Sequence, residues 1–313
     1  MNMNATSVKM DNNFRSFKRL CKKIIKGKAF QKDEFGTGLF DLTLRGAIRK
    51  QQNRPEGSNN VPAKLLLSPV DGNRASKHAT TRIFIGSEDA QHRAERVLLW
   101  SILKHRDPEK YYEVRIMKDL EGFDRKYWKT GFTGYRYAIP EFAGFEGRAI
   151  YNDVDQIYLD DPAKLQAENM CGAAVLALES RDTSVMVMNC AELKNVWTIA
   201  AIQSSPERKI HASMLGHVRR KLLIGDLPVY WNARDHEYDE HSSKLLHYTT
   251  LHMQPWRPFR KDLRYRENPH GKLWQELENE ADQRGFALEW KTQPGRSYID
   301  MEGFYELENI AST

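Results

Sequence analysis

The chain is organised around Arg148-Ala-Ile-Tyr-Asn-Asp-Val-Asp-Gln-Ile-Tyr-Leu-Asp-Asp-Pro162, in which a short apolar run ends in two nearby carboxylates. Residues i and i+2 of an extended segment point to the same side, so Asp153 and Asp155 can bind one cation while Val154 faces away. Carboxylate oxygens suit Mg²⁺ or Mn²⁺, which keep positions open for phosphate oxygens. The stretch is therefore typical of a site for a metal-bridged diphosphate.

A simpler interpretation of the same stretch is an Asx turn, because paired Asp residues at a strand end commonly form one. The residues that follow favour the metal site. Asp161-Pro162 is typical of a helix N-cap followed by a first-turn proline. The two carboxylates then lie on a loop between a strand and a helix, where open α/β sheets bind ligands.

Three segments in this order resemble the core of GT-A glycosyltransferases: Thr133-Gly-Tyr-Arg-Tyr-Ala-Ile-Pro140, Ala149–Asp155 and Ile157–Pro162. The resemblance is to the glycogenin-like family 8 and its bacterial lipopolysaccharide-type relatives, and it covers roughly Arg82 to Phe259. It implies an α/β fold with a mixed sheet flanked by helices, an N-terminal helical arm and a small C-terminal extension.

The resemblance also implies a function. It is metal-dependent transfer of a hexosyl group from a nucleotide diphospho-sugar, expected to be a UDP-sugar, to a glycan or lipid-linked acceptor with retention at the anomeric carbon. Mn²⁺ or Mg²⁺ would neutralise charge on the departing diphosphate. Asp153 and Asp155 match the Asp-x-Asp ligands, and His247, which stands before Pro255-Trp256, matches the third ligand. A single His after Leu246 is also typical of a core histidine.

Several further residues match the donor site of the family. Arg136 matches a basic residue aimed at the donor, and with Asp153 and Asp155 it completes the expected catalytic set. Ser87 and Glu88 would lie beside the uracil and ribose. The full set of expected donor contacts is Ser87, Glu88, Arg136, Asn152, Val154, Asp182, His252, Trp256 and Arg257.

The chain departs from the family at three places. Asp182 stands where the family has Asn, no Asp-Gln pair opens a helix near 211–215, and Gln254 stands where a diphosphate-binding Lys is common. Either a neighbour such as His252, Arg257 or Arg260 supplies the missing charge, or stabilisation of the leaving group is weaker. A non-catalytic nucleotide-sugar-binding protein is therefore the alternative function.

Two other functions fit less well. A nucleotidyltransferase would need a Gly-rich phosphate loop after the first strand, which the segment after Arg82-Ile-Phe-Ile-Gly86 lacks. A nucleic-acid-binding protein would account for the net charge of +6 and the pI of about 9.0, but no recognition module accompanies the basic residues. We expect no nucleic-acid partner, and the sequence does not indicate an oligomeric state.

The chain has 313 residues, of which 40% are hydrophobic and 29% charged, and this length and composition are typical of one large α/β domain with extensions. We expect a basic arm and linkers over 1–80, the transferase domain over 81–260 and a helical extension over 261–313. Strands are expected at 82–86, 112–117, 171–178, 182–190 and 227–232, and helices at 94–104 and around 273–277.

The N-terminal arm has the pattern of an interfacial helix. Residues 14–28 carry seven Lys or Arg and six apolar side chains at helical spacing, which is typical either of binding to anionic lipid or of docking on the protein's own core. No apolar run approaches 18 residues, and the three cysteines form no disulfide or metal pattern. We therefore expect a cytoplasmic protein, with a peripheral position on the inner face of the membrane as the alternative.

Overall fold

The computed structural model describes residues 61–67, 69, 80–88, 91–123, 132–204, 210–221, 223–256 and 266–286. The basic stretch 14–28, Arg257 and Arg260 lie outside these residues. No helix in the described part is both long and apolar enough to cross a bilayer.

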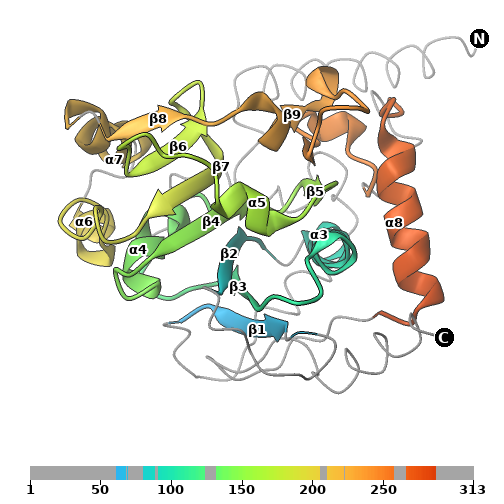
Figure 1. The fold of residues 1–313 in the computed structure, drawn as a ribbon, viewed down its shortest axis with the longest axis horizontal. Coiled ribbons are helices and arrows are strands. Elements are labelled where there is room, and N and C mark those ends of the chain that lie inside the picture. The colour runs from blue at the N-terminus through green and yellow to red at the C-terminus, as the bar shows by residue number, and fades with distance from the viewer. Residues whose placement is uncertain are drawn as a thin grey trace, which may run out of the picture.

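A seven-stranded mixed sheet forms the centre of the fold (Figure 1), in the order β1-β3-β2-β4-β7-β6-β8. Strand β2 is parallel to its neighbours β3 and β4, whereas β4 pairs antiparallel with β7, and β6 runs parallel to β8. The strands are β1 (Ala63–Leu67), β2 (Thr81–Gly86), β3 (Tyr112–Met117), β4 (Arg148–Asp153), β6 (Val175–Leu178), β7 (Asp182–Asn189) and β8 (Ile224–Asp226). The expected α/β class with a mixed sheet is confirmed.

Helices cover the sheet because its central strands are apolar on both faces. In β2, for example, Ile83, Phe84 and Ile85 are all fully buried, although they alternate in direction. The α-helices are α3 (His92–His105), α4 (Ile139–Phe142), α5 (Pro162–Gln166), α6 (Ile199–Ser204), α7 (Ile210–Arg220) and α8 (Gly271–Gln283). Helix α5 begins as the sequence predicts, since Asp161 Oδ1 accepts a hydrogen bond of 2.8 Å from the Ala163 N–H.

A second, three-stranded sheet stands beside the first, in the order β5-β10-β9. Its strands are β5 (Gln156–Tyr158), β9 (Ala233–Arg234) and β10 (Leu245–His247). Strand β10 pairs antiparallel with β5, so that His247 is opposite Gln156. A segment from late in the chain is thereby fixed next to the loop that follows β4.

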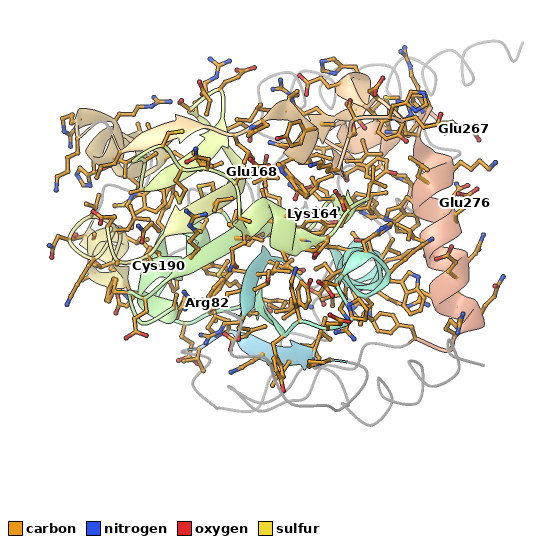
Figure 2. All side chains as sticks on the ribbon, in the orientation of Figure 1. Arg82, Lys164, Glu168, Cys190, Glu267 and Glu276 are labelled. Atoms are coloured by element: carbon orange, nitrogen blue, oxygen red, sulfur yellow. The ribbon has the colours of Figure 1, made fainter. Side chains whose placement is uncertain are left out.

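The C-terminal helix α8 docks on α3, and Figure 1 shows the two side by side. Trp274 and Leu277 are buried on the inner face of α8, whereas Glu276 points outward to solvent (Figure 2). Lys104 of α3 contacts Glu280 of α8 at 2.7 Å, and two arginines of α3 pair with the acids that flank Glu280 on α8, Glu278 and Asp282. The extension is thus attached to the α/β core by an apolar stripe with an ion-paired rim.

Several segments differ from the sequence-based expectation. The strand expected at 171–178 begins only at Val175, after a turn at Cys171, and the loop expected between the Asp pair and α5 contains the strand β5. Residues 227–232 do not form a strand: Val229–Trp231 is a 3₁₀ turn, η6, between β8 and β9. Pro228 lacks an N–H to donate, and the Trp231 N–H instead closes the turn onto the Pro228 carbonyl at 3.0 Å. Strand β1 lies within the range 1–80 assigned to arm and linkers, yet it forms the edge of the main sheet through antiparallel pairing with β3.

Candidate functional site

The ends of three parallel strands form the floor of the candidate site. Gly86 at the end of β2 is opposite both Met117 of β3 and Asp153 of β4, so these strands end at one edge of the sheet. Strand β7 is antiparallel and therefore begins at the same edge, with Asp182 as its first residue. This is the edge at which open α/β sheets bind ligands.

Asp153, Asp155 and His247 lie together at this edge. Each offers one ligand atom, and the three atoms lie within 4.8 Å of one another. The Tyr248 N–H donates to the Asp155 carbonyl at 2.9 Å, which ties the loop after β4 to the end of β10. The three residues predicted from the sequence to be metal ligands are thus brought together by the pairing of β5 with β10.

Two donors hold the Asp153 carboxylate, and both reach the same oxygen. Arg136 Nη2 donates to Oδ1 at 2.7 Å, and the Tyr151 hydroxyl donates to it at 2.5 Å. None of the described residues is hydrogen-bonded to Oδ2, which leaves that oxygen for a cation. Burial, opposed by the Arg136 charge and helped by the neighbouring charge of Asp155, raises the pKa of Asp153 to about 6.

A hydrogen-bonded chain orients the His247 imidazole. His247 Nδ1 lies 2.9 Å from Asn232 Oδ1, and Asn232 Nδ2 donates to Ser184 Oγ at 3.1 Å. Ser184 Oγ donates in turn to Asp182 Oδ1 at 2.6 Å. Because the Asn232 amide uses its N–H₂ on Ser184, its oxygen must accept from His247, and this assigns the imidazole hydrogen to Nδ1. Nε2 is then the nitrogen that faces the carboxylates.

The facing atoms of His247 and Asp155 require a positive charge between them. His247 Nε2 lies 3.2 Å from Asp155 Oδ1, a buried oxygen that accepts no hydrogen bond of good geometry from the described residues. Two lone pairs at this separation repel unless a proton or a cation binds them. Burial alone would lower the pKa of His247, but the carboxylates of Asp155 and Asp153 outweigh it and raise this pKa. Two carboxylates and an imidazole nitrogen are a donor set that fits a divalent cation such as Mn²⁺.

Arg136 is a buried component of the site. Its Nε donates to the Thr133 carbonyl at 3.0 Å, and its Nη1 donates to the Thr183 carbonyl at 2.6 Å and to Thr183 Oγ1 at 2.8 Å. The guanidinium also lies 4.5 Å above the centre of the Tyr151 ring. Burial opposes its charge, but Asp153 reverses that effect and raises the pKa of Arg136, so the side chain stays charged. This arginine holds a metal ligand in place.

Ser87 and Glu88 follow β2 directly, at the edge where the nucleotide is expected. Both are buried, and the Ser87 hydroxyl donates to the Glu95 carboxylate of α3. Lys118, at the end of β3, lies 3.8 Å from the same carboxylate. A buried ion pair therefore fixes the ends of β2 and β3 to the first turn of α3, and the role of Ser87 and Glu88 in binding a base or ribose stays a prediction.

The side chains of Asn152 and Val154 belong to the core. The Asn152 amide donates to Gln156 Oε1 at 2.7 Å and accepts from the Tyr158 hydroxyl at 2.7 Å, and Val154 is 1% exposed. Only the backbone of these two residues remains for contact with a nucleotide. The prediction that Asn152 and Val154 contact the donor is therefore limited to their backbone atoms.

The remaining expected donor residues lie in separate segments of the chain. Asp182 begins β7, His252 lies in the 3₁₀ turn η8 (Leu251–Met253), and Trp256 is 4% exposed. The Trp256 indole N–H donates to Gln91 Oε1 at 3.0 Å, so the ring is used in packing. Arg257 lies outside the described residues.

Sequence reasoning did not assign roles to several residues of this site. They are Tyr151, Thr183, Ser184 and Asn232, together with Gln254, whose amide donates to Asp155 Oδ2 at 3.2 Å. The polar entrance of β7 was visible in the sequence as Asp182-Thr-Ser before an apolar run. No local pattern indicated the amides, because their partners are distant in sequence.

Three solved structures similar to this one are glycosyltransferases. The apo form of GlyE from Streptococcus pneumoniae TIGR4 has 16% identity and a TM-score of 0.46, over 70% of this chain and 66% of that chain. The bifunctional WbbM has 12% identity and a TM-score of 0.45, over 66% of this chain and 52% of that one. The galactosyltransferase LgtC, in complex with donor and acceptor sugar analogues, has 12% identity and a TM-score of 0.44, over 66% of this chain and 100% of that one.

No family model and no curated protein matches the sequence. The present chain spans about two thirds of the length of GlyE and about half of that of WbbM. A likeness of this degree transfers no residue role to the present chain.

Proposed function

We propose that this protein is a metal-dependent glycosyltransferase that moves a sugar from a nucleotide diphospho-sugar, a UDP-sugar, to a glycan or lipid-linked acceptor with retention. The observation that carries the proposal is the cluster of Asp153, Asp155 and His247 at the carboxyl edge of the sheet. Its donor atoms fit a divalent cation, and an Asp-x-Asp sequence at the end of a central strand is the feature shared with GT-A enzymes.

In this proposal Asp153 and Asp155 each provide one carboxylate oxygen to the cation, and His247 provides Nε2. Arg136 and Tyr151 keep Asp153 in place through its other oxygen. A divalent cation bound there supplies the positive charge that stabilises a departing diphosphate. Arg136 then acts by positioning a ligand, because its three nitrogens are already hydrogen-bonded within the protein.

The nucleotide would lie over the ends of β2 and β4, with Ser87 and Glu88 on the side of the base and ribose and Asp182 on the side of the sugar. The chain Asp182–Ser184–Asn232 connects the sugar side to His247. His252, Arg257 and Arg260 are the candidates for additional positive charge near the diphosphate.

The proposal also includes a location. A lipid-linked or envelope-glycan acceptor would be reached from the cytoplasm, with residues 14–28 holding the enzyme at an anionic membrane face. Support for this part comes from the basic and apolar pattern of the sequence alone.

A screen of nucleotide sugars with Mn²⁺, reading released nucleotide, tests the function. We expect release with a UDP-sugar that depends on the metal, and loss of it in Asp155→Asn. The matched control is Asp226→Asn, because Asp226 is an exposed residue at the end of β8 whose carboxylate accepts from Ser180.

Binding measurements separate the enzyme from the alternative of a non-catalytic binding protein. Calorimetric UDP binding that needs Mn²⁺, without turnover of any donor with or without sugar acceptors, would favour the binding protein. UDP affinity that is the same in Asp155→Asn and in the unmodified protein would show that the metal assignment is wrong.

A further inference from the structure

Gln254 lies beside the candidate metal centre in a fully enclosed position. The residue is 1% exposed and follows the turn η8. Its Nε2 donates to two acceptors, Asp155 Oδ2 at 3.2 Å and the Tyr248 carbonyl at 2.9 Å. Because both partners are acceptors, they determine which end of the amide is nitrogen.

Because of this contact, the two carboxylate oxygens of Asp155 have different roles. Oδ2 is held by the Gln254 amide, whereas Oδ1 lies 3.2 Å from His247 Nε2 and accepts no hydrogen bond of good geometry from the described residues. A carboxylate with one oxygen fixed can turn only a little about its Cβ–Cγ bond. The other oxygen therefore keeps its direction toward the metal cluster.

The donor at this position is uncharged. A Lys or Arg in contact with Asp155 would add a second positive charge, besides that of Arg136 on Asp153, within a few ångströms of the cation, and like charges this close in a partly dry site repel strongly. An amide orients the carboxylate without that repulsion and leaves its negative charge available to the metal. Gln254 is thus suited to support a ligand.

The segment that carries Gln254 is itself fixed by aromatic packing. The Trp256 indole donates to Gln91 Oε1 at the start of α3, and its ring packs edge-on to Tyr248 with centroids 5.9 Å apart. Trp274 of α8 packs against the same indole, with ring centroids 5.6 Å apart. The amide is therefore held by the same contacts that attach α8 to the core.

We propose that Gln254 is a positioning residue of the metal centre, whose neutral amide fixes one oxygen of Asp155 so that the other faces the cation. The proposal rests on the metal assignment made under the proposed function. A diphosphate-binding lysine is common at this position in the family. Under this proposal, Gln254 orients Asp155 instead of binding the diphosphate.

The test uses the full chain with Mn²⁺ and saturating UDP, with bound metal measured by calorimetry or by the electron paramagnetic resonance of free Mn²⁺. Loss of a hydrogen bond that orients a ligand typically costs 10–100-fold in metal affinity, so Gln254→Met should raise the Mn²⁺ dissociation constant by about that factor. Visible absorption of bound Co²⁺ should change as well, since that spectrum reports ligand geometry. If Gln254 served only to pack the core, the Mn²⁺ dissociation constant and the Co²⁺ spectrum of the variant would both match those of the unmodified protein.

Gln166→Met is the matched control, with the same chemical change at the opposite edge of the sheet. Gln166 Oε1 accepts from the backbone of Arg82 at the start of β2, at 2.8 Å. We expect this variant to keep its Mn²⁺ affinity within about twofold of the unmodified protein, a change well below the factor expected for an orienting residue.

Gln254→Lys is the second variant and covers the case in which Gln254→Met does not fold. The lysine keeps a donor for Asp155 but adds charge, so it should weaken Mn²⁺ binding while leaving the Co²⁺ spectrum close to that of the unmodified protein. Unchanged Mn²⁺ affinity in either folded variant overturns the proposal and leaves the proposed function intact. If the unmodified protein binds no Mn²⁺ with UDP, the metal centre and this proposal fall together.

Discussion

Replacing Arg136 by Met should destabilise the protein strongly in the absence of metal. The side chain is 4% exposed and hydrogen-bonds to Asp153, to the Thr133 carbonyl and to Thr183. Its loss leaves the Asp153 carboxylate, which is 18% exposed, without its charged partner. Breaking a buried pair from one side costs about 3–5 kcal/mol, because the remaining charge keeps its desolvation penalty.

The free energy of unfolding, measured in urea with EDTA present, gives the comparison. Arg181→Met is the control, since Arg181 pairs with Glu179 and the two side chains are 70% and 44% exposed. Pairs in such positions contribute about 0–1 kcal/mol. The loss in free energy of unfolding should therefore be several times larger for Arg136→Met than for Arg181→Met.

The double variant Arg136→Met/Asp153→Asn separates the electrostatic cause from lost packing. Removing the carboxylate charge removes the penalty that Arg136→Met creates, so the double variant should be more stable than the sum of the two single effects predicts. A cost below about 1 kcal/mol for Arg136→Met, or strictly additive single effects, would refute the reasoning, because a buried pair broken from one side costs more than that and couples its partners.

Three further predictions concern other parts of the chain. Asn232→Leu removes the acceptor for His247 Nδ1 and should weaken Mn²⁺ binding by about 10–100-fold in calorimetry, and an unchanged affinity would exclude the orienting role. Gly86→Ala should lower the free energy of unfolding by about 1–3 kcal/mol in urea, because a Cβ there meets the hydroxyl of Tyr151, and a neutral effect would show that the ring moves away at no cost. Deletion of residues 14–28 should abolish co-sedimentation with phosphatidylglycerol vesicles, and binding by the intact chain should weaken as salt rises, whereas equal recovery of both proteins would show that the arm does not bind lipid.

Local sequence patterns predicted the elements whose cause is local. The apolar run at 112–117 became β3 with the same bounds, and the strand expected at 82–86 became β2 with one added residue. The start of α5 followed from Asp161-Pro162, because an N-cap acts within one turn of its own residue. The helix expected at 94–104 is contained in α3.

Patterns failed where a long-range partner decides the conformation. The apolar segment around 227–232 has strand-like composition, but the 3₁₀ turn η6 forms there and the Tyr230 carbonyl accepts from the Lys244 N–H at 2.7 Å. Strand β1 lies in a region with linker-like flanks and becomes a strand because β3 presents a free edge to it. Its pairing partner is about fifty residues away along the chain, which no local window includes.

The sequence by itself determined the chemistry of the candidate site and the edge of the sheet at which it lies. Asp153 and Asp155 at the end of an apolar run place two carboxylates at the end of a strand, although β5 separates them from the N-cap at Asp161. Only the tertiary structure decided how those carboxylates are used. The antiparallel pairing of β10 with β5 brings His247 to Asp155, and the amides of Asn232 and Gln254 then assign one nitrogen and one oxygen to the cluster. The physical reason is that hydrogen-bond direction depends on the relative position of groups from separate segments, whereas the kind of ligand depends only on the side chain.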